Sequence, residues 1–311
     1  MNNIICIAGP TASGKTALAV ELAKELNGEV VSCDSMQVYR RMDIGTAKPT
    51  EEEKQGIPHH MLDVAEPGED FSVSRYCAMA TPIVDDILAR GKTAIIAGGT
   101  GLYMDSLIKG NDFAPFPATG MREKLEHQAD EEGMEAMFAL LASIDPDSAA
   151  RLHLQDRKRI LRALEVYCET GETITAHNLK TQAIPPKYSP IWLGLDFADR
   201  ADLYRRIDLR VDLMLQQGLI PEIRSLLSEG IPTKSTAMQA IGYKEFVDAL
   251  AGNSSVEEAA EAVKQSSRRY AKRQLTWFRR NPQMHWLVRG ADTESSEILA
   301  HARQLIHESD N

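Results

Sequence analysis

A short glycine-rich stretch near the start of the chain has the residue types and spacing of a phosphate-binding loop. Residues 9–16, "GPTASGKT", match the pattern G-x-x-x-x-G-K-[ST]. In this pattern backbone N–H groups cradle phosphate oxygens, the lysine supplies a point charge and the last hydroxyl reaches Mg²⁺. Nothing in the stretch separates ATP from another ligand that carries a diphosphate. The predicted diphosphate site comprises Gly9, Pro10, Thr11, Ala12, Ser13, Gly14, Lys15 and Thr16.

A carboxylate follows the next apolar run of the chain. Asp34 closes "GEVVSCD" and opens "DSMQVY", and three roles are open to it. It can cap a helix or loop, hold Mg²⁺ through water or orient an acceptor hydroxyl as in a kinase, or act as a general base. Gln37 favours a nucleobase as the acceptor, because a carboxamide pairs bidentately with adenine.

A second glycine-rich turn, "GGTGLY", places Thr100 at the end of a third apolar run. The turn is either a tight connection between a strand and a helix, or a site that offers the Thr100 hydroxyl and nearby N–H groups to a phosphate. We favour the second interpretation because such turns recur at predicted strand ends. The preceding run, "TAIIAG", lacks the acid of a Walker-B motif, which weakens the interpretation as an NTPase.

Alternating apolar runs and amphipathic stretches must position these residues. Strands are predicted in "IICIAG", "GEVVSCD", "TAIIAGGTG" and "IWLGLDF", with a helix in "TALAVELAKEL". This alternation is typical of βαβ units around a parallel sheet, so the predicted fold class is α/β with a P-loop NTPase-like core. Since the carboxyl ends of parallel strands form the ligand crevice, Asp34 should lie close to the phosphate loop. His59 and His60 are predicted to be loop or packing residues.

Two stretches rich in proline and turn residues, 111–120 and 182–190, flank a segment that reads as helical throughout. Helix starts are expected at Asp145 and Asp156, and a stop at Gly171. We therefore predict an inserted helical subdomain, residues 118–185, between core segments 1–117 and 186–311. After "IWLGLDF" the rest of the chain is predicted to be helical, with a long amphipathic helix over residues 256–280.

Length and composition limit the class of protein. The 311 residues, 43% of them hydrophobic, suffice for one large α/β domain with an insertion. The four cysteines form no C-x-x-C pair, which favours a reducing cytosol. No export signal opens the sequence, and no apolar run reaches membrane-spanning length. We expect a cytoplasmic monomer with no membrane partner.

The charge is distributed unevenly along the chain. The net charge of −10, taken alone, argues against a nucleic-acid partner. Residues 262–291, however, contain no Asp or Glu, and "RLHLQDRKRILR" forms a second basic cluster. Such clusters are either solvated helix faces or surfaces that follow an RNA backbone. In the first segment the cations alternate with aromatic residues, of which Trp277 or Phe278 is expected in the core.

The motifs together resemble the tRNA dimethylallyltransferases, also called tRNA isopentenyltransferases or IPP transferases, over nearly the whole chain. The joint set is far more specific than the phosphate loop, which many unrelated enzymes share. The sequence contains no C-terminal zinc finger of the eukaryotic relatives, so the resemblance is to the bacterial type. The matching segments, in order, are "GPTASGKT", "DSMQVYRRMDIGTAKP", "PHHMLD", "GGTGLY", "RKRILRALEVYCETG", "AIGYKE" and "RQLTWFRR".

The resemblance implies transfer of a dimethylallyl group from dimethylallyl diphosphate to N6 of adenosine 37, just 3′ of the tRNA anticodon. It implies Mg²⁺ at Thr16, Asp34 as the catalytic base, and Thr100 and Arg210 as further catalytic ligands of the diphosphate. Lys158 stands where the family pattern has Gln, and a lysine contacts phosphate but accepts no hydrogen bond. The implied tRNA contacts are Asp34, Ser35, Met36, Gln37, Thr100, Arg122, Lys158, Arg159, Ile160, Leu161, Arg162, Gln239, Ala240, Ile241, Gly242, Tyr243 and Lys244.

Two other functions use some of the same features. A small-molecule or nucleotide kinase would bind ATP at the same loop, with Mg²⁺ and a strand-end Asp. It accounts poorly for the second glycine turn and for the acid-free basic segment. A non-catalytic RNA-binding NTPase would need the basic segment but no reactive carboxylate.

Overall fold

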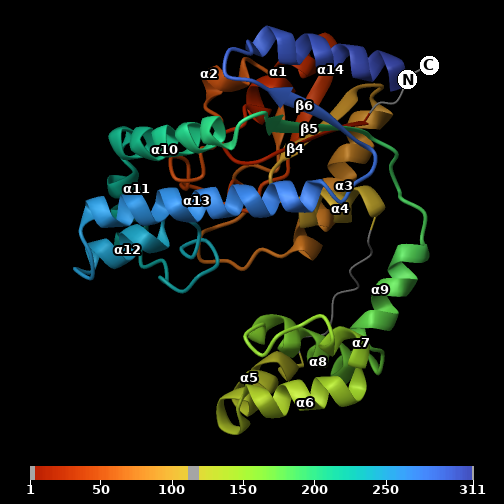
Figure 1. Cartoon of the computed structure of the whole chain (residues 1–311), viewed down its shortest axis with the longest axis vertical. Coiled ribbons are helices and arrows are strands. Elements are labelled where there is room, and N and C mark those ends of the chain that lie inside the picture. Colours follow the sequence, from red (N-terminus) through yellow and green to blue (C-terminus); the bar gives the residue numbers. More distant parts are fainter. Residues whose placement is uncertain (1–3, 111–118, 310–311) are drawn as a thin grey trace. The chain divides into compact units, whose positions relative to one another are not determined.

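The structure, a computed structural model, describes residues 4–110 and 119–309 and divides the chain into two compact units (Figure 1). Unit 1 joins Met1–Gly110 with Lys187–Asn311, and unit 2 is Asn111–Pro186. The predicted boundary after residue 117 lies outside the described residues. The second division lies between Pro186 and Lys187, one residue after the boundary predicted from the sequence.

Unit 1 is built on a parallel sheet of six strands in the order β3-β2-β4-β1-β5-β6. Every residue of β1 and β2 is buried, as expected for central strands covered on both faces. The α/β fold class and the strands predicted from the four apolar runs are confirmed. The strands are β1 Ile4–Ala8, β2 Gly28–Ser32, β3 His59–His60, β4 Thr93–Gly98, β5 Ile191–Phe197 and β6 Met284–Arg289.

Two strands differ from the prediction. His59 and His60 pair with Val30 and Val31 as edge strand β3, so they are not loop residues. Strand β6 lies in the part of the chain predicted to be helical, and that prediction is wrong there. In β6 only Met284 and Leu287 are buried, three residues apart, so the sequence lacks the period-2 alternation that indicates a strand.

Helices cover both faces of the sheet (Figure 1). Helices α1 and α14 share one apolar core with β1, β5 and the neighbouring strands. Helices α3 and α4 pack on the opposite face, where α13 contacts α4 and α10. Among the described residues no helix has both the length and the apolarity to cross a bilayer. The helices are α1 Lys15–Glu25, α2 Glu51–Lys54, α3 Val73–Ala89, α4 Gly101–Lys109, α10 Arg200–Gln217, α11 Leu219–Ser228, α12 Lys244–Leu250, α13 Val256–Phe278 and α14 Ser295–Ser309.

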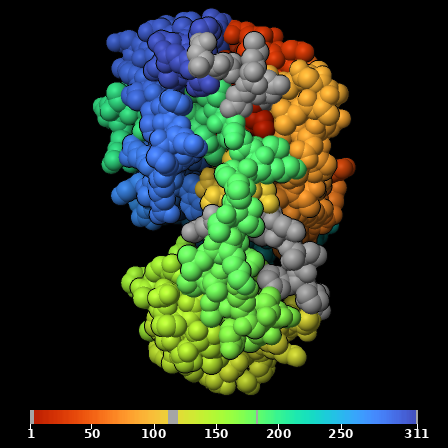
Figure 2. All heavy atoms as spheres, turned by 90° about the vertical axis from the view of Figure 1, so that its right-hand side faces the viewer, coloured from red at the N-terminus to blue at the C-terminus, as the bar shows by residue number. Residues whose placement is uncertain are grey.

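Unit 2 consists of helices around a core of its own. Its described residues are the yellow to green spheres of Figure 2. The Asp145 carboxylate accepts hydrogen bonds from the N–H groups of Ser148 and Thr175, both at 3.0 Å, and so fixes the starts of α7 and α9. Gly171, in the left-handed conformation, ends α8 as predicted. The helices are α5 Met121–Glu132, α6 Met134–Ile144, α7 Pro146–Ala149, α8 Arg157–Thr170 and α9 Ile174–Ala183.

The core of unit 2 corrects part of the expected tRNA surface. Ile160 and Leu161 are 0% and 1% exposed, so their side chains pack inside the unit and cannot contact a nucleic acid. In the same segment, residues 158–162 of α8, the exposed residues are Lys158, Arg159 and Arg162. The helical period therefore gives this segment one buried face and one cationic face.

We expect Ile160→Ala to lower the free energy of unfolding by about 2–5 kcal/mol, because it leaves a cavity in the core of unit 2. Arg159→Ala, on the exposed face, should change it by less than about 0.5 kcal/mol. Urea denaturation of the full chain measures both values. Equal effects of the two changes would contradict the assignment of the buried face.

Candidate active site

Three strand ends meet at one edge of the sheet. Ala8 pairs with Gly98 at the ends of β1 and β4, and Ser32 pairs with Ala97. The phosphate loop, the loop that opens at Asp34 and the second glycine turn therefore begin side by side. The Thr100 hydroxyl oxygen accepts a hydrogen bond from the N–H of Ser35 at 3.0 Å, which joins the last two loops directly.

The phosphate loop leads directly into α1, so the positive end of the helix dipole faces any bound anion. The Lys15 ammonium donates a hydrogen bond to the carbonyl of Pro10 at 2.6 Å. Its burial, aided by the charge of Arg210 and opposed by that of Asp34, lowers the pKa of Lys15 to about 7. The Ser13 hydroxyl is buried and has no hydrogen-bond partner among the described residues. A phosphate would supply both the acceptor and the counter-charge that these groups lack.

Arginines from two other elements surround the loop. Arg210 of α10 lies 3.5 Å from the Thr11 hydroxyl, measured from Nη1 to Oγ1. Arg206, one turn earlier, donates from Nε to the carbonyl of Ala12 at 3.0 Å. Burial lowers the pKa of Arg289, at the end of β6, and the nearby charge of Arg206 adds to the effect. Positive charge thus accumulates around the loop in excess of the acids that face it.

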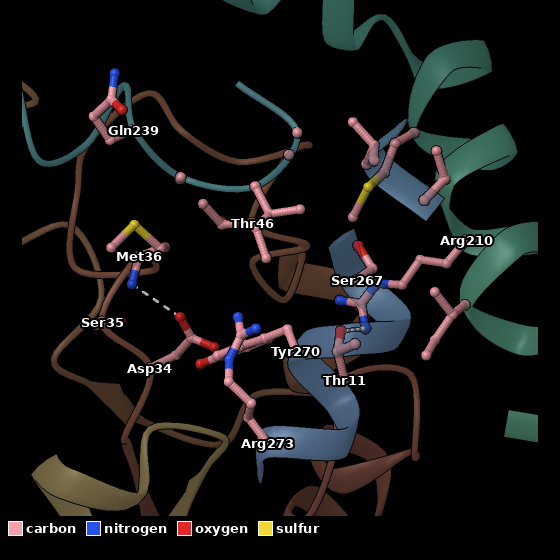
Figure 3. A pocket seen from close by; sticks show the side chains of 18 residues that line it. Thr11, Asp34, Ser35, Met36, Thr46, Arg210, Gln239, Ser267, Tyr270 and Arg273 are labelled. Carbon is pink, nitrogen blue, oxygen red and sulfur yellow. Dashed lines mark hydrogen bonds between the residues drawn. The ribbon is translucent and has the colours of Figure 1, made fainter. Parts of the chain in front are cut away.

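A cavity of about 280 Å³ opens beside these groups in unit 1 (Figure 3). It brings together residues from the phosphate loop, the Asp34 loop, the segment before α12, and helices α10 and α13. Of the predicted site residues, those that line it are Thr11, Asp34, Ser35, Met36, Arg210, Gln239, Ala240, Ile241 and Gly242. Thr100, Lys244 and the rest of the phosphate loop are not among the lining residues.

The two oxygens of Asp34 have different surroundings. Oδ1 accepts hydrogen bonds from the N–H groups of Met36 at 2.9 Å and Gln37 at 3.4 Å, which shapes the start of the loop. Oδ2 has no hydrogen-bond partner among the described residues, and the carboxylate lies at the cavity (Figure 3). The structural and the chemical role considered for Asp34 are thus compatible, one for each oxygen.

Gln37 does not have the role expected for it. Its carboxamide donates to the carbonyls of Thr46 and Ala47, at 3.3 and 3.1 Å, and accepts from the Ser32 hydroxyl at 3.0 Å. Because its donors and its acceptor are all engaged, it cannot pair bidentately with an adenine. Gln37 instead closes the loop between residues 34 and 48.

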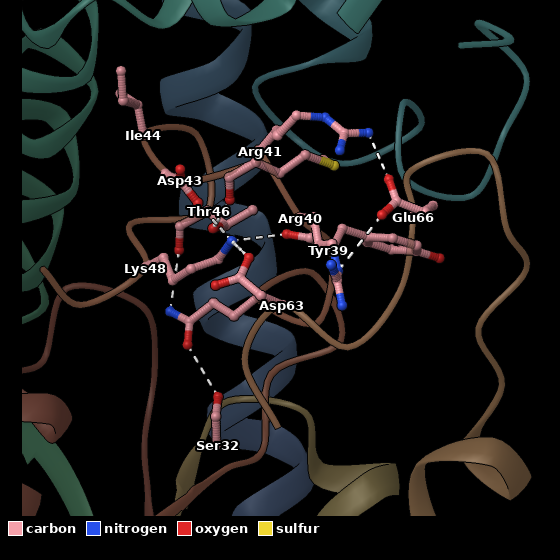
Figure 4. A network of polar contacts seen from close by, with 12 residues as sticks. Ser32, Tyr39, Arg40, Arg41, Asp43, Ile44, Thr46, Lys48, Asp63 and Glu66 are labelled. Atoms are coloured by element: carbon pink, nitrogen blue, oxygen red, sulfur yellow. Dashed lines mark hydrogen bonds and ion pairs between the residues drawn. The ribbon is translucent and has the colours of Figure 1, made fainter. Parts of the chain in front are cut away.

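A buried lysine holds the same loop from the other side (Figure 4). The Lys48 ammonium donates to the carbonyl of Tyr39 at 2.8 Å and to carboxylates of Asp43 and Asp63, both at 2.6 Å. A buried ammonium requires such partners, since an unpaired charge in the interior is costly. The residues that line the cavity are therefore held by an internal polar network.

Glu222 of α11 joins two motifs that are far apart in the sequence. Its carboxylate accepts hydrogen bonds from the N–H groups of Asp43, Ile44 and Gly45, at 2.9, 2.8 and 3.1 Å. The hydroxyl of Tyr243 donates to the same carboxylate at 2.6 Å. A Cβ on Gly45 would lie 2.5 Å from the Tyr243 ring, so this approach requires glycine. Tyr243 is fully buried, so the prediction that it contacts tRNA is wrong.

One wall of the cavity consists of residues that were not predicted from the sequence, apart from Arg210. Helix α10 contributes Ile207, Val211 and Met214, and α13 contributes Val263, Ser267, Tyr270 and Arg273. Both sets recur at helical spacings, so a search for amphipathic faces beside Arg210 would have found them. Burial and the charge of Asp34 raise the pKa of Tyr270 to about 12, so its hydroxyl remains a hydrogen-bond donor at neutral pH. Gly45 and Thr46 complete the lining.

Known proteins resemble this chain over nearly its whole length. Residues 37–281 match the sequence model of the family described as IPP transferase. A tRNA dimethylallyltransferase of Acetivibrio thermocellus is 45% identical over 307 residues, 98% of each chain. Another, of Thermoanaerobacter sp., is 49% identical over 285 residues, which cover 91% of this chain and 90% of the relative.

Two solved structures have the same fold. The tRNA isopentenylpyrophosphate transferase of Bacillus halodurans has a TM-score of 0.75 and 41% identity, covering 99% of this chain and 96% of its own. A eukaryotic dimethylallyltransferase acting on tRNA has a TM-score of 0.84 and 31% identity, covering 99% of this chain and 80% of its own. The chain belongs to the IPP transferase family.

Proposed function

We propose that the protein transfers a dimethylallyl group from dimethylallyl diphosphate to N6 of adenosine 37 in the anticodon loop of tRNA. The observation that carries the proposal is that Thr11 of the phosphate loop and the neighbouring Arg210 line the same cavity as the Asp34 carboxylate. A leaving group and an acceptor can thus be held at opposite ends of one space. The names of the relatives, tRNA dimethylallyltransferases, support the same reaction.

The diphosphate is the leaving group of this reaction. An exocyclic adenine amine is a weak nucleophile, so the allylic C–O bond must weaken before or as the new bond forms. Lys15 and Arg210 can stabilise the charge that develops on the departing oxygen, and the start of α1 adds its dipole. Binding of the diphosphate would also restore the charged form of Lys15.

The apolar wall of the cavity suits the transferred group. Ile207, Val211 and Met214 lie on the same side of α10 as Arg210, and Val263 of α13 lines the same space. A branched five-carbon chain has no hydrogen-bonding atoms, so a surface of aliphatic side chains can hold it without leaving a polar group unpaired. We place the prenyl chain there.

Asp34 would act as the base on the acceptor side. As N6 bonds to the allylic carbon, the C–O bond to diphosphate breaks and the amine becomes positively charged. The free Oδ2 of Asp34 can then accept the N6 proton, while Oδ1 keeps its bonds to the loop N–H groups. The base must leave its stack to reach the cavity, which costs less in an anticodon loop than in a duplex.

The donor groups present fit a magnesium ion that is held mainly by the substrate. No cluster of three or more His, Cys, Asp or Glu side chains that could hold a metal occurs among residues 4–110 and 119–309. Mg²⁺ commonly binds through one or two protein ligands together with phosphate oxygens and water. The Thr16 hydroxyl, in the first turn of α1, would be that ligand. When bound, the ion would neutralise part of the diphosphate charge.

We propose that α13 contacts the tRNA backbone. Its acid-free segment contains two kinds of cation. Lys264, Arg268 and Arg279 form ion pairs with acids of α10 and β5. Arg269 and Lys272 are exposed and form no ion pair within the described part of the chain. These two are available to phosphates. In unit 2 Lys158, Arg159 and Arg162 are also exposed, and Arg159 and Arg162 form ion pairs with Asp156 and Glu165.

The decisive experiment is mass spectrometry of tRNA nucleosides after incubation with the protein, Mg²⁺ and dimethylallyl diphosphate. We expect N6-(dimethylallyl)adenosine and free diphosphate as the products. We also expect the protein to be a monomer and to act in the cytoplasm. A kinase would instead be stabilised against heat by ATP and not by the prenyl diphosphate. That result, with no prenylated nucleoside, would exclude the proposed reaction.

Asp34→Asn should lower the rate of prenyl transfer at least about 100-fold, because an amide cannot accept the N6 proton. The Asn Oδ1 retains the hydrogen bonds to the loop, so binding of pyrophosphate and of tRNA should persist. Single-turnover kinetics and filter binding measure the two properties. Asp292→Asn, at an exposed site, is the control. Full prenyl transfer by Asp34→Asn would refute its role as the base. Absence of prenyl transfer in the wild type and in the variant, with tRNA binding retained, would support a non-catalytic RNA-binding protein.

Lys15→Met should stabilise the ligand-free protein near neutral pH. Below a pH of about 7 Lys15 is charged in both the folded and the unfolded chain, and the folded chain bears the full cost of burying that charge. Between 7 and the ordinary value of 10.5 the folded chain loses the proton first, and the cost declines. Thermal denaturation across this range should show a Tm gap that is largest at the low end and closes toward pH 10.5. Lys234→Met, at an exposed site, should show no such trend.

The double change Arg269→Gln with Lys272→Gln should weaken tRNA binding and reduce the slope of log K against log salt by about 1–2. Affinity for pyrophosphate should stay the same. The control is Lys24→Gln with Arg303→Gln, which removes two exposed charges from α1 and α14 that are paired with Glu21 and Glu25. If both double variants reduce the slope equally, α13 has no special role in tRNA binding.

A further inference from the structure

A buried glutamine of α13 connects the phosphate loop to the second glycine turn. Gln274 is 5% exposed. Its Oε1 accepts a hydrogen bond from the N–H of Thr11 at 3.0 Å, and its Nε2 donates to the carbonyl of Gly99 at 2.9 Å. The two partners fix the orientation of the amide, since a backbone N–H only donates and a carbonyl only accepts. We call this pair of hydrogen bonds the Gln274 bridge.

The backbone at Gly99 leaves room for this bridge. A Cβ at position 99 would lie 2.1 Å from Nε2 of Gln274, so any other residue would displace the carboxamide. Gly99 of the second glycine-rich turn is therefore required by its close contact with α13. It lets a side chain from α13 reach between the ends of β1 and β4.

The bridge also changes which groups of the phosphate loop are available to a ligand. The N–H of Thr11 is committed to Gln274, so Thr11 meets the cavity through its hydroxyl, which lies 3.5 Å from Arg210. The N–H groups of the following loop residues, Lys15 and the Ser13 hydroxyl are not involved in the bridge. Loss of the bridge should therefore leave most of the diphosphate-binding groups intact.

The helix that carries Gln274 also faces the acceptor side. Tyr270 and Arg273, four and one residues earlier, line the cavity beside Asp34 (Figure 3). The glycine turn reached by the bridge continues into Thr100, which accepts a hydrogen bond from the N–H of Ser35. Gln274 thus lies between the leaving-group side and the acceptor side of one cavity.

We propose that Gln274 is a positioning residue for prenyl transfer: the bridge sets the spacing between the phosphate loop and the Thr100–Asp34 side of the cavity. The inference rests on the proposed function. Attack of N6 on the allylic carbon requires the two substrates to be aligned, and a displacement of about 1 Å can cost about 100-fold in rate. The bridge acts on that alignment, and not on the binding of the diphosphate itself.

Gln274→Met keeps the length of the side chain and removes both hydrogen bonds. We expect kcat, at saturating tRNA and prenyl diphosphate, to fall about 10- to 100-fold. The Kd for pyrophosphate with Mg²⁺, measured by calorimetry, should change by less than about 3-fold, because the groups that bind the diphosphate remain. Loss of one hydrogen bond to the ligand would change the Kd about tenfold. Gln265→Met, an exposed site on the same helix, is the matched control and should leave both values unchanged.

Gln274→Glu separates positioning from packing. Its Oε1 can still accept from Thr11, but an ionised second oxygen would face the carbonyl of Gly99, and two acceptors repel. Protonation of that oxygen restores the donor. The kcat of Gln274→Glu, divided by that of the wild type, should therefore rise as the pH is lowered. A side chain that only fills space would give no such recovery.

Three results would overturn the positioning role: an unchanged kcat in a folded Gln274→Met, equal losses in kcat and in pyrophosphate affinity, or a pH-independent kcat ratio for Gln274→Glu. Failure of the wild-type protein to prenylate tRNA would instead overturn the proposed function. The bridge itself is then judged by hydrogen exchange of the peptide that contains Thr11. Faster exchange in Gln274→Met supports the bridge, and unchanged exchange refutes it.

Discussion

Parallel pairing of β1 with β4, and of β4 with β2, ends three strands at the same edge of the sheet. Each chain segment that leaves this edge carries part of the site: the phosphate loop after Ala8, Asp34 after β2, and Thr100 after β4. In an antiparallel arrangement neighbouring strands would end at opposite edges, and these groups would be separated by the length of a strand. The register Ala8–Gly98 therefore determines that a leaving group and a base can serve one cavity.

The polar groups near the cavity fall into two classes. Those that shape the loops are satisfied within the protein: Lys48 by two carboxylates and a carbonyl, and three loop N–H groups by Glu222. Around the phosphate loop the pairing is incomplete: the Lys15 ammonium donates to the carbonyl of Pro10 but faces no carboxylate within hydrogen-bond distance and has a lowered pKa, and the Ser13 hydroxyl has no partner among the described residues. The residues that form the walls of the site are thus held by hydrogen bonds within the protein, whereas the anion-binding groups still have capacity to bind a ligand.

The sequence predicts those parts of the site that are encoded in a few consecutive residues. The phosphate loop and Asp34 lie at strand ends that the apolar runs indicate, and the structure places them together. Glu222 and Gln274 could not be found in this way. The loop N–H groups that Glu222 binds lie 177 to 179 residues away, and the two partners of Gln274 lie 175 and 263 residues away. No local pattern distinguishes either residue from other polar helix residues.

The errors have a common origin. Gln37 has the chemistry to read adenine, but a carboxamide bonds equally well to backbone, and the loop uses it that way. Ile160, Leu161 and Tyr243 belong to motifs that also contain exposed residues, and the helical period or a buried partner turns them inward. A motif indicates that a segment matters, whereas the burial of each side chain decides whether it contacts a ligand or supports a neighbour that does.

The pairing of charges on α13 explains how a protein with a net charge of −10 can still bind an anionic partner. Acids of α10 and β5 neutralise Lys264, Arg268 and Arg279, which orders the helix against its neighbours. Arg269 and Lys272 take no part in these ion pairs, and both are exposed. At physiological ionic strength charges farther than about 8 Å are largely screened. A tRNA phosphate close to α13 would therefore respond to the local surplus of cations, and the acids on the rest of the surface would contribute little to its binding.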